Sequence, residues 1–284
     1  MLADYHVHSA YSDDSTYPME QVVRDAIRTN LDELCFTEHV DYGVKPDWDQ
    51  PADARFENGR PVTNCPYPAY FEELDRVRER YGAQVRIARG LELGVQTHTI
   101  PTYERLLERY GSQLDFTLLS IHQAGDREFW NGAFQEGRTQ EQFTMAYYEE
   151  LLGVVERFHG YSVVAHLDLI RRYDPTPGGP LPFSEVRDIV AEILSRVIAG
   201  GHGIEVNTSG WRYGLDGPQP TDDVLLLYRD LGGRILTLGS DSHKPEHLGA
   251  YLRIAQDRLR ALGFSQACAY EKGELMGYDN YADY

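Results

Sequence analysis

Seven short apolar runs alternate with longer amphipathic segments along this chain, and this alternation restricts the possible folds more than any other feature. It is typical of βα units, in which parallel strands form a sheet and the intervening helices cover it. The expected strands lie at about 2–8, 33–37, 84–93, 115–122, 162–166, 203–207 and 234–239. The expected helices lie at about 18–29, 68–81, 100–110, 140–158, 184–199, 221–231 and 247–262. The pattern therefore predicts an α/β barrel.

A length of 284 residues suits one large barrel as well as two ordinary domains. No Ser/Gly-rich linker, repeat or low-complexity tract divides the chain, so we expect a single domain over residues 1–284. Two segments, at about 41–66 and 123–139, are too long for ordinary βα loops, and we expect them to be lids or substrate-binding insertions. The last twenty or so residues receive no predicted element.

The formal net charge of −18 argues against DNA or RNA as a partner, because nucleic-acid binding draws affinity from Lys and Arg contacts to phosphates. The N-terminus lacks the basic and long apolar parts of a signal peptide, and no stretch approaches the roughly 20 apolar residues of a membrane span. We therefore expect a cytoplasmic protein without a membrane partner. The three cysteines show no paired spacing, which argues against a disulfide framework or a cysteine zinc site. The sequence does not indicate an oligomeric state.

Histidines and carboxylates gather where the predicted strands end. His6 and His8 end the first strand and, because side chains alternate along an extended chain, lie on one face about 7 Å apart. Donors of the same kind end five further strands: Glu38 and His39, Glu92, His122, His166 and Asp168, and Asp241 and His243. In a parallel barrel these ends converge on one mouth, where six of the ten histidines would then meet. Scatter of histidines over polar loops would rarely produce this coincidence.

Imidazole and carboxylate donors without thiolates suit zinc, manganese or iron. The donors outnumber what one ion can use, so the sequence implies more than one ion. Glu92 lies on an otherwise apolar strand, where a carboxylate is costly to bury without a cation. Its two oxygens can bridge two ions, whereas a histidine donates one lone pair to one ion.

These motifs resemble the polymerase and histidinol phosphatase family, abbreviated PHP, and within it the histidinol-phosphate phosphatases. The resemblance spans residues 4 to about 250, with its motifs in the order that the family shows. It is carried by His6 and His8, Asp13-Asp14, Thr37-Glu38-His39, Gly90-Leu91-Glu92, Ser120-Ile121-His122, Ala165-His166-Leu167-Asp168-Leu169, Glu205-Val206-Asn207-Thr208-Ser209-Gly210 and Ser240-Asp241-Ser242-His243.

The resemblance implies a distorted (β/α)7 barrel, similar to a TIM barrel, with two or three divalent ions (zinc, manganese or iron) at the C-terminal strand ends. It suggests ligands for each ion: His6, His8, Glu92 and Asp241 for the first, Glu92, His122 and His166 for the second, and His39, His243 and one early residue for the third. Many relatives have a histidine at that early position, where this chain offers Asp13 or Asp14. Counting six residues on from His8 reaches Asp14, whereas the surrounding Ser-Asp pattern matches Asp13.

A hydroxide activated by the metal ions is expected to attack phosphorus in line, with Glu92, Asp241 and His243 as the catalytic set. Three arginines could bind the phosphate through their planar guanidinium groups, with an ordinary surface charge as the alternative for each: Arg171, Arg172 and Arg212. Asn207 and Glu205 alternate onto one face of a strand, where they could fix an imidazole or bind a substrate amine. A structural hydrogen bond is the alternative for both.

The leading hypothesis is hydrolysis of a small phosphomonoester, L-histidinol phosphate to L-histidinol and phosphate, in histidine biosynthesis. The chain length, the inserted loops and the stretch from His166 to Arg172 look most like that branch of the family. One alternative is a phosphatase for another small phosphoester. Another is a metal-dependent 3′–5′ exonuclease, which the acidic charge opposes. A third is a catalytically inactive barrel that binds metal or a ligand.

Overall fold

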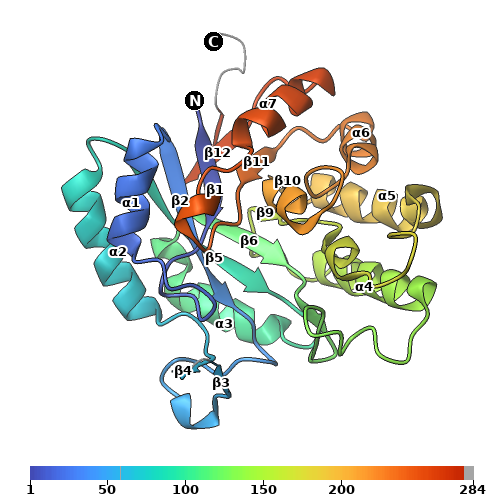
Figure 1. Ribbon diagram of the computed structural model, residues 1–284, viewed down its shortest axis with the longest axis horizontal. Coiled ribbons are helices and arrows are strands. Elements are labelled where there is room, and N and C mark those ends of the chain that lie inside the picture. The colour runs from blue at the N-terminus through green and yellow to red at the C-terminus, as the bar shows by residue number, and fades with distance from the viewer. Residues whose placement is uncertain (58, 278–284) are drawn as a thin grey trace.

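A parallel sheet forms the centre of the protein in the computed structural model, which describes residues 1–57 and 59–277 (Figure 1). Its strands are β1 (Ala3–Val7), β2 (Glu33–Val40), β5 (Arg86–Gly94), β6 (Phe116–Ser120), β9 (Val163–Val164), β10 (Gly203–Asn207) and β11 (Leu236–Gly239). They pair in parallel, in the order in which they occur along the chain. Each of the seven predicted strands is therefore present.

The two edge strands of this sheet meet, so that the sheet is nearly closed into a barrel. The end of β1 pairs in parallel with Ser242, which lies just beyond β11. The His8 backbone N–H donates to the Ser242 carbonyl at 2.8 Å, and the Ser242 N–H donates to the His6 carbonyl at 3.2 Å. The buried Asp4 carboxylate joins the same edges by accepting hydrogen bonds from the Ser240 N–H at 2.8 Å and the Ser240 hydroxyl at 2.5 Å. The predicted barrel is confirmed.

One α-helix follows each strand of the barrel and covers its outside (Figure 1). The helices are α1 (Met19–Arg28), α2 (Tyr67–Tyr81), α3 (Ile100–Tyr110), α4 (Gln140–Val155), α5 (Phe183–Ala199), α6 (Asp222–Asp230) and α7 (Leu252–Ala261). All seven predicted helices are confirmed, but α7 begins at Leu252 instead of near residue 247. The helix starts later than predicted because Gly249 and Tyr251 adopt φ values of +68° and +62°, outside the helical range.

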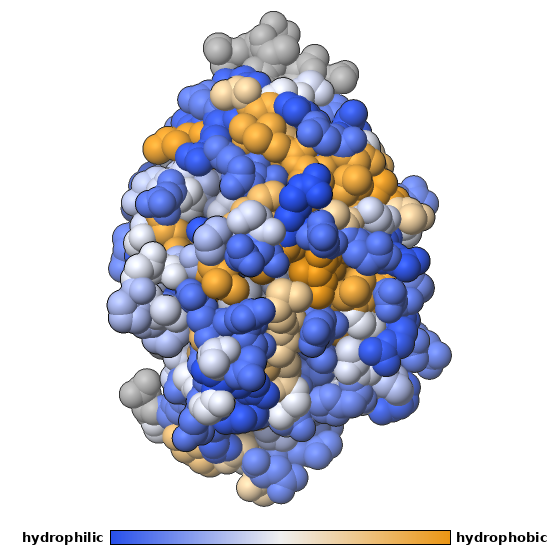
Figure 2. All heavy atoms as spheres, turned by 90° about the vertical axis from the view of Figure 1, so that its right-hand side faces the viewer, coloured by the Kyte–Doolittle hydropathy of each residue, from blue (hydrophilic) through white to orange (hydrophobic). Residues whose placement is uncertain are grey.

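The helices present a polar outer surface. The side of the molecule that carries α4, α5 and α6 is mostly hydrophilic, with separate hydrophobic patches toward its upper part (Figure 2). The main apolar core lies between these helices and the sheet. Among the described residues, none of the helices combines the length and the apolar character needed to cross a membrane.

The inside of the barrel has an apolar layer near the N-terminal ends of the strands, called the lower layer, and a polar layer near their C-terminal ends, called the upper layer. Side chains two or four positions apart on a strand share a face, so the inward positions of β2 run from Cys35 to His39 and those of β5 from Ala88 to Glu92. The pairing of β1 is irregular between Asp4 and Val7. Irregularities of this kind re-aim side chains. The lower layer consists of Tyr5, Cys35, Ala88, Phe116, Leu118, Val163, Ala165, Ala269 and Tyr270.

Two of these apolar residues come from a hairpin that covers the lower end of the barrel. The hairpin pairs β12 (Cys268–Glu271) with β13 (Glu274–Gly277), in a part of the chain for which the sequence predicted no element. Tyr270 is 4% exposed, and its ring centroid lies 5.1 Å from that of Phe116. Its backbone N–H donates to the Tyr5 hydroxyl at 2.8 Å, and its carbonyl accepts a hydrogen bond from Arg86 at 3.1 Å. This hairpin therefore closes the core.

Both segments that were expected to be insertions form small antiparallel hairpins. The first contains β3 (Phe56–Glu57) and β4 (Arg60–Pro61), and the second contains β7 (Gln123–Ala124) and β8 (Arg127–Glu128). An ion pair of 2.7 Å joins Arg55 in the first segment to Glu128 in the second. The two segments therefore meet, at the end of the barrel where the histidines lie.

Replacement of Tyr270 by alanine is expected to lower the free energy of unfolding by about 3–5 kcal/mol, because it opens a cavity in the lower layer of the barrel. Urea denaturation measures this loss. Leu275 is a matched control, since it pairs with Tyr270 in the hairpin but is 44% exposed. Leu275→Ala should change the free energy of unfolding by less than about 0.5 kcal/mol. Equal losses in the two variants would contradict a closing role for Tyr270.

Candidate metal centre

Side chains from the C-terminal strand ends surround one buried glutamate, Glu92, which is 1% exposed. They come from separate strands: His6 and His8 from the end of β1, His39 from β2, His122 from the end of β6, His166 from the end of β9, and Asp241 and His243 from the end of β11. The structure thus brings together six histidines and two carboxylates that lie far apart along the chain.

The two oxygens of Glu92 face two different groups of histidines. Its Oε2 lies 3.1 Å from His6 Nε2, 3.3 Å from His8 Nε2 and 3.0 Å from His39 Nδ1. Its Oε1 lies 3.0 Å from the Nε2 atoms of both His122 and His166. One carboxylate is therefore placed between two sets of nitrogen donors.

Buried atoms without hydrogen-bond partners identify this cluster as a site that fits cations. Glu92 Oε2, His6 Nε2, His8 Nε2 and His39 Nδ1 all lack a hydrogen bond within the described residues. Buried polar atoms are normally paired, so four such atoms facing one another indicate a missing partner. Several sets of three donors, among them His6, His8 and Glu92, lie within 4.8 Å of one another. Imidazole and carboxylate donors at this spacing suit zinc, manganese or iron.

Two of the imidazoles are oriented by carboxylates on the side away from Glu92. His6 Nδ1 lies 2.7 Å from Glu205 Oε1, and His122 Nδ1 lies 2.7 Å from Asp41 Oδ1. A carboxylate only accepts, so Nδ1 of each ring carries a proton, and Nε2 is the nitrogen that can exchange its proton for a metal ion. Both rings are therefore held in the form that binds a metal.

A serine fixes His8 in the same form. The Ser12 hydroxyl donates its one proton to Glu38 Oε2 at 2.6 Å. Ser12 Oγ then accepts a hydrogen bond from the His39 backbone N–H at 3.1 Å and from His8 Nδ1 at 3.0 Å. Nε2 of His8 is left with a lone pair that faces Glu92.

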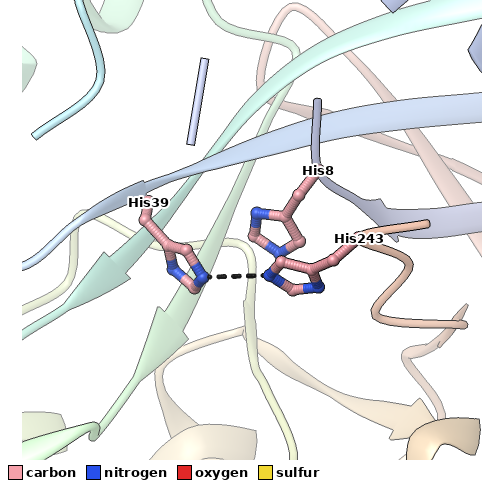
Figure 3. Close-up of side chains that lie close together, drawn as sticks. All are labelled: His8, His39 and His243. Carbon is pink, nitrogen blue, oxygen red and sulfur yellow. Dashed lines mark hydrogen bonds between the residues drawn. The ribbon is translucent and has the colours of Figure 1, made fainter. Parts of the chain in front are cut away.

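His39 and His243 approach each other at the third part of the cluster, beside His8 (Figure 3). Their Nε2 atoms are 3.4 Å apart. Asp14 Oδ2 lies 3.1 Å from His243 Nε2 and 3.5 Å from His39 Nε2. Asp13 turns elsewhere and accepts a hydrogen bond from Lys45 at 2.8 Å. Of the two aspartates that the sequence left open, Asp14 is the one that lies against these histidines.

The electrostatic field of the cluster favours ionised carboxylates. Burial opposes the charge of Glu92, but the imidazoles of His6, His122 and His39 outweigh it and hold the pKa of Glu92 well below its ordinary value. Burial also opposes the charge of His122, yet Glu92 and Asp41 raise the pKa of this histidine to about 9. Protons on imidazoles therefore balance the carboxylates in the absence of metal, and a bound cation would replace them.

Unusual backbone conformations and glycines allow the side chains of the cluster to lie close together. His166 and Asp241 adopt positive φ values of 24° and 56°, which side-chain-bearing residues rarely do and which often mark functional sites. A Cβ on Gly239 would overlap Glu205 Oε1 and the Cβ of His6, and a Cβ on Gly94 would overlap Asp41 Oδ1. The two glycines therefore leave room for the carboxylates that orient His6 and His122.

A cavity of about 320 Å³ opens above the cluster. Glu92, His166 and Asp241 lie among the residues that line it. Both inserted segments also contribute to its wall, the first through Lys45, Arg55 and Glu57 and the second through Gln123, Glu128 and Trp130. The site is therefore a pocket suited to a small molecule.

The predicted substrate-binding residues differ in their relation to this cavity. Arg172 lines it, and its guanidinium donates to Ser209 and lies 3.4 Å from Asp241 Oδ2. Arg171 instead lies beside the buried Asp168, with 3.6 Å between Nε and Oδ2. Arg212 donates to the backbone carbonyls of Ser240 and Asp241 at 2.7 and 2.9 Å and supports the chain after β11.

Asn207 lies behind the cluster. Its Nδ2 is 3.2 Å from Glu205 Oε2 and 3.3 Å from His6 Nδ1, and its Oδ1 accepts a hydrogen bond from the Ser209 N–H at 2.9 Å. It thus contacts the carboxylate that orients His6.

Sequence reasoning did not single out Asp41 and Lys45. Asp41 lies two positions after His39, so strand alternation could have placed it on the same face. Lys45 Nζ lies 2.9 Å from Asp41 and 2.8 Å from Asp13. Its position depends on the path of the inserted segment, for which the sequence carries no signal.

Comparison with known proteins gives relatives over nearly the whole chain. The sequence model described as the PHP domain matches residues 4–209. A histidinol-phosphatase from Lactococcus lactis is 29% identical over 271 residues, which cover 94% of this chain and 93% of the relative.

Solved structures are also similar to this chain over most of its length. The Lactococcus lactis histidinol phosphate phosphatase in complex with zinc, L-histidinol and phosphate superimposes with a TM-score of 0.84 at 28% identity, covering 96% of this chain and 98% of that one. A structure from Listeria monocytogenes has a TM-score of 0.74 at 22% identity, covering 88% and 98% of the two chains, and supports the fold alone.

Substitution of Asp41 by asparagine is expected to weaken metal binding about 10-fold to 100-fold, because His122 loses the charged partner that orients its ring. Titration of the metal-free protein with zinc measures this affinity. Asp188→Asn is a control, since Asp188 is a fully exposed carboxylate on α5. Equal zinc affinities in the two variants would contradict the role assigned to Asp41.

Proposed function

Since this chain belongs to the PHP family, we propose that it is a metal-dependent phosphoric monoester hydrolase that converts L-histidinol phosphate to L-histidinol and phosphate. The observation that carries the proposal is the set of histidine and carboxylate donors around Glu92, in a chain that matches histidinol-phosphatases over nearly its full length. The related structure that holds zinc, L-histidinol and phosphate supports the substrate and one of the metals. A small cavity also suits a substrate of this size better than a polymer.

Two or three divalent ions, of zinc, manganese or iron, are proposed to be held by the donors described above. His6, His8, Glu92 and Asp241 would hold the first ion, Glu92, His122 and His166 the second, and His39, His243 and Asp14 the third. Bound there, such ions supply a water activated for attack and neutralise charge on the phosphoryl oxygens. Glu92 would belong to the donor sets of both the first and the second ion.

Asp241 and Arg172 are proposed to act together on the phosphoryl group. His6 and Arg172 outweigh the burial of Asp241 and hold its pKa well below the ordinary value, so it stays an acceptor for a nucleophilic water. The Arg172 guanidinium lies over the Tyr213 ring at 4.1 Å from the centroid, which orients its planar face at the cavity wall. A guanidinium held in this way can donate a charge-assisted hydrogen bond to a phosphoryl group.

Release of phosphate from L-histidinol phosphate, measured beside a panel of other phosphomonoesters, tests the proposal. We expect L-histidinol phosphate to have the highest kcat/KM, and chelation of metals to abolish turnover. Glu92→Ala should lose both bound metal and turnover, because it removes the group between the two sets of histidines. Near-normal activity in Glu92→Ala, or turnover of another ester only, would overturn the assignment.

The two neighbouring arginines should differ in their effect on substrate binding. Arg172→Met is expected to lower kcat/KM about 10-fold to 100-fold, mainly through KM, because a hydrogen-bonded charge is lost from the cavity wall. Arg171→Met should change kcat/KM by less than about threefold, since Arg171 lies beside Asp168 and outside the lining of the cavity. Steady-state kinetics on purified variants distinguish the two, and equal losses would contradict the separation.

A further inference from the structure

One polar atom in the cavity wall lacks a partner and does not belong to the metal donors. Gln123, which directly follows His122, is 1% exposed and lines the cavity. Its Nε2 donates to the Gly94 carbonyl at 2.8 Å. Its Oε1 is buried and has no hydrogen-bond partner within residues 1–57 and 59–277.

The orientation of this amide is fixed, so the unpaired atom is an acceptor. Rotation by a half-turn would bring Gln123 Oε1 against the Gly94 carbonyl oxygen, and two acceptors cannot share a hydrogen bond. Leaving a buried acceptor unpaired costs about 1–3 kcal/mol. The wall of the cavity therefore holds a buried oxygen that requires a donor.

A carboxylate lies beside this acceptor. Gln123 on β7 and Glu128 on β8 are direct partners across the hairpin, which places their side chains on the same face. The Glu128 side chain is 11% exposed and also lines the cavity. Its Oε1 lies 2.7 Å from Arg55, and its Oε2 accepts a hydrogen bond from Asn131 at 3.0 Å.

The charge around this carboxylate is not balanced. Arg55 is shared between two acids, since its Nε also lies 3.1 Å from Glu57 Oε1. Arg55, Glu57 and Glu128 all line the cavity. One guanidinium thus faces two carboxylates, which leaves an excess negative charge beside the Gln123 oxygen and favours a positively charged donor.

We propose that Gln123 and Glu128 form the binding site for the ammonium group of the substrate. The inference rests on the proposed function, because L-histidinol phosphate carries its ammonium on the carbon next to the CH2–O–P group. Such an ammonium must lie close to the phosphate, and Gln123 lies next to the ligand His122 in the chain. The ammonium donates one hydrogen bond to Gln123 Oε1, while the Glu128 carboxylate balances its charge. Esters without a cation leave the Gln123 oxygen unpaired and the excess negative charge unbalanced, so the site selects the amine-bearing substrate.

Two substrates that differ only in the ammonium test this proposal: L-histidinol phosphate and 3-(imidazol-4-yl)propyl phosphate, in which hydrogen replaces the amine. The measured quantity is the ratio of their kcat/KM values. We expect the unmodified enzyme to prefer the amine by about tenfold or more. Gln123→Leu and Glu128→Gln should each lower the ratio toward one, by up to about tenfold, because they remove an acceptor or a charge that only the ammonium uses.

Arg127→Met is the matched control, since it removes a charge from the same hairpin outside the lining of the cavity and keeps the Glu128 carboxylate. It should retain the preference for the amine. Zinc titration of each variant checks that the metal donors remain intact. A ratio near one in the unmodified enzyme, or equal losses on both substrates in the Gln123 and Glu128 variants, would overturn the ammonium site while leaving the phosphatase function in place. Absence of turnover of L-histidinol phosphate in the unmodified enzyme would instead overturn the proposed function.

Discussion

The burial of Glu92 in the middle of the barrel is the constraint on which the rest of the site depends. A carboxylate that is 1% exposed cannot stay ionised in an apolar interior, because the loss of hydration costs far more than packing returns. Here positive charge must come from imidazolium groups or from metal ions. The surrounding histidines can supply either, since each can exchange a proton for a cation. The polar upper layer of the barrel is thus a single electrostatic unit centred on this glutamate.

Some residues of the cluster around Glu92 also close the barrel. The backbone of His6 and His8 pairs with Ser242, so the seam between the first and last strands also sets the distance between the candidate metal donors that they carry. Glu205, on β10, reaches across to orient His6, and only the absence of a side chain at Gly239 allows this. Metal binding should therefore hold the two edges of the sheet together, because its donors come from both sides of the seam.

The sequence predicted the structural features that follow a repeating pattern. It did not predict those features whose position depends on a single contact with a distant part of the chain. Strands, helices and the gathering of donors such as His39 and His122 follow from periodicity and from the rule that parallel strands end at one rim. The hairpin that carries Tyr270 has no such period, since its burial depends on Phe116 and Tyr5 elsewhere in the chain. The two adjacent arginines after β9 were equivalent in sequence. A short 3-10 turn at Leu169–Tyr173 separates their directions, so that one borders the cavity and the other packs beside Asp168.

The division between barrel and inserted segments also separates the chemistry from the selectivity. In the proposed reaction, the donors around Glu92 would recognise only what all phosphomonoesters share, a phosphoryl group and its charge. Groups that can distinguish one ester from another must lie farther out, and the two insertions supply these to the wall through Arg55, Glu57 and Glu128. The ion pair between Arg55 and Glu128 fixes one insertion against the other. Because this contact lies on the cavity wall, movement of either segment would change the fit for the part of the substrate beyond the phosphate, while the buried donors below stay in place.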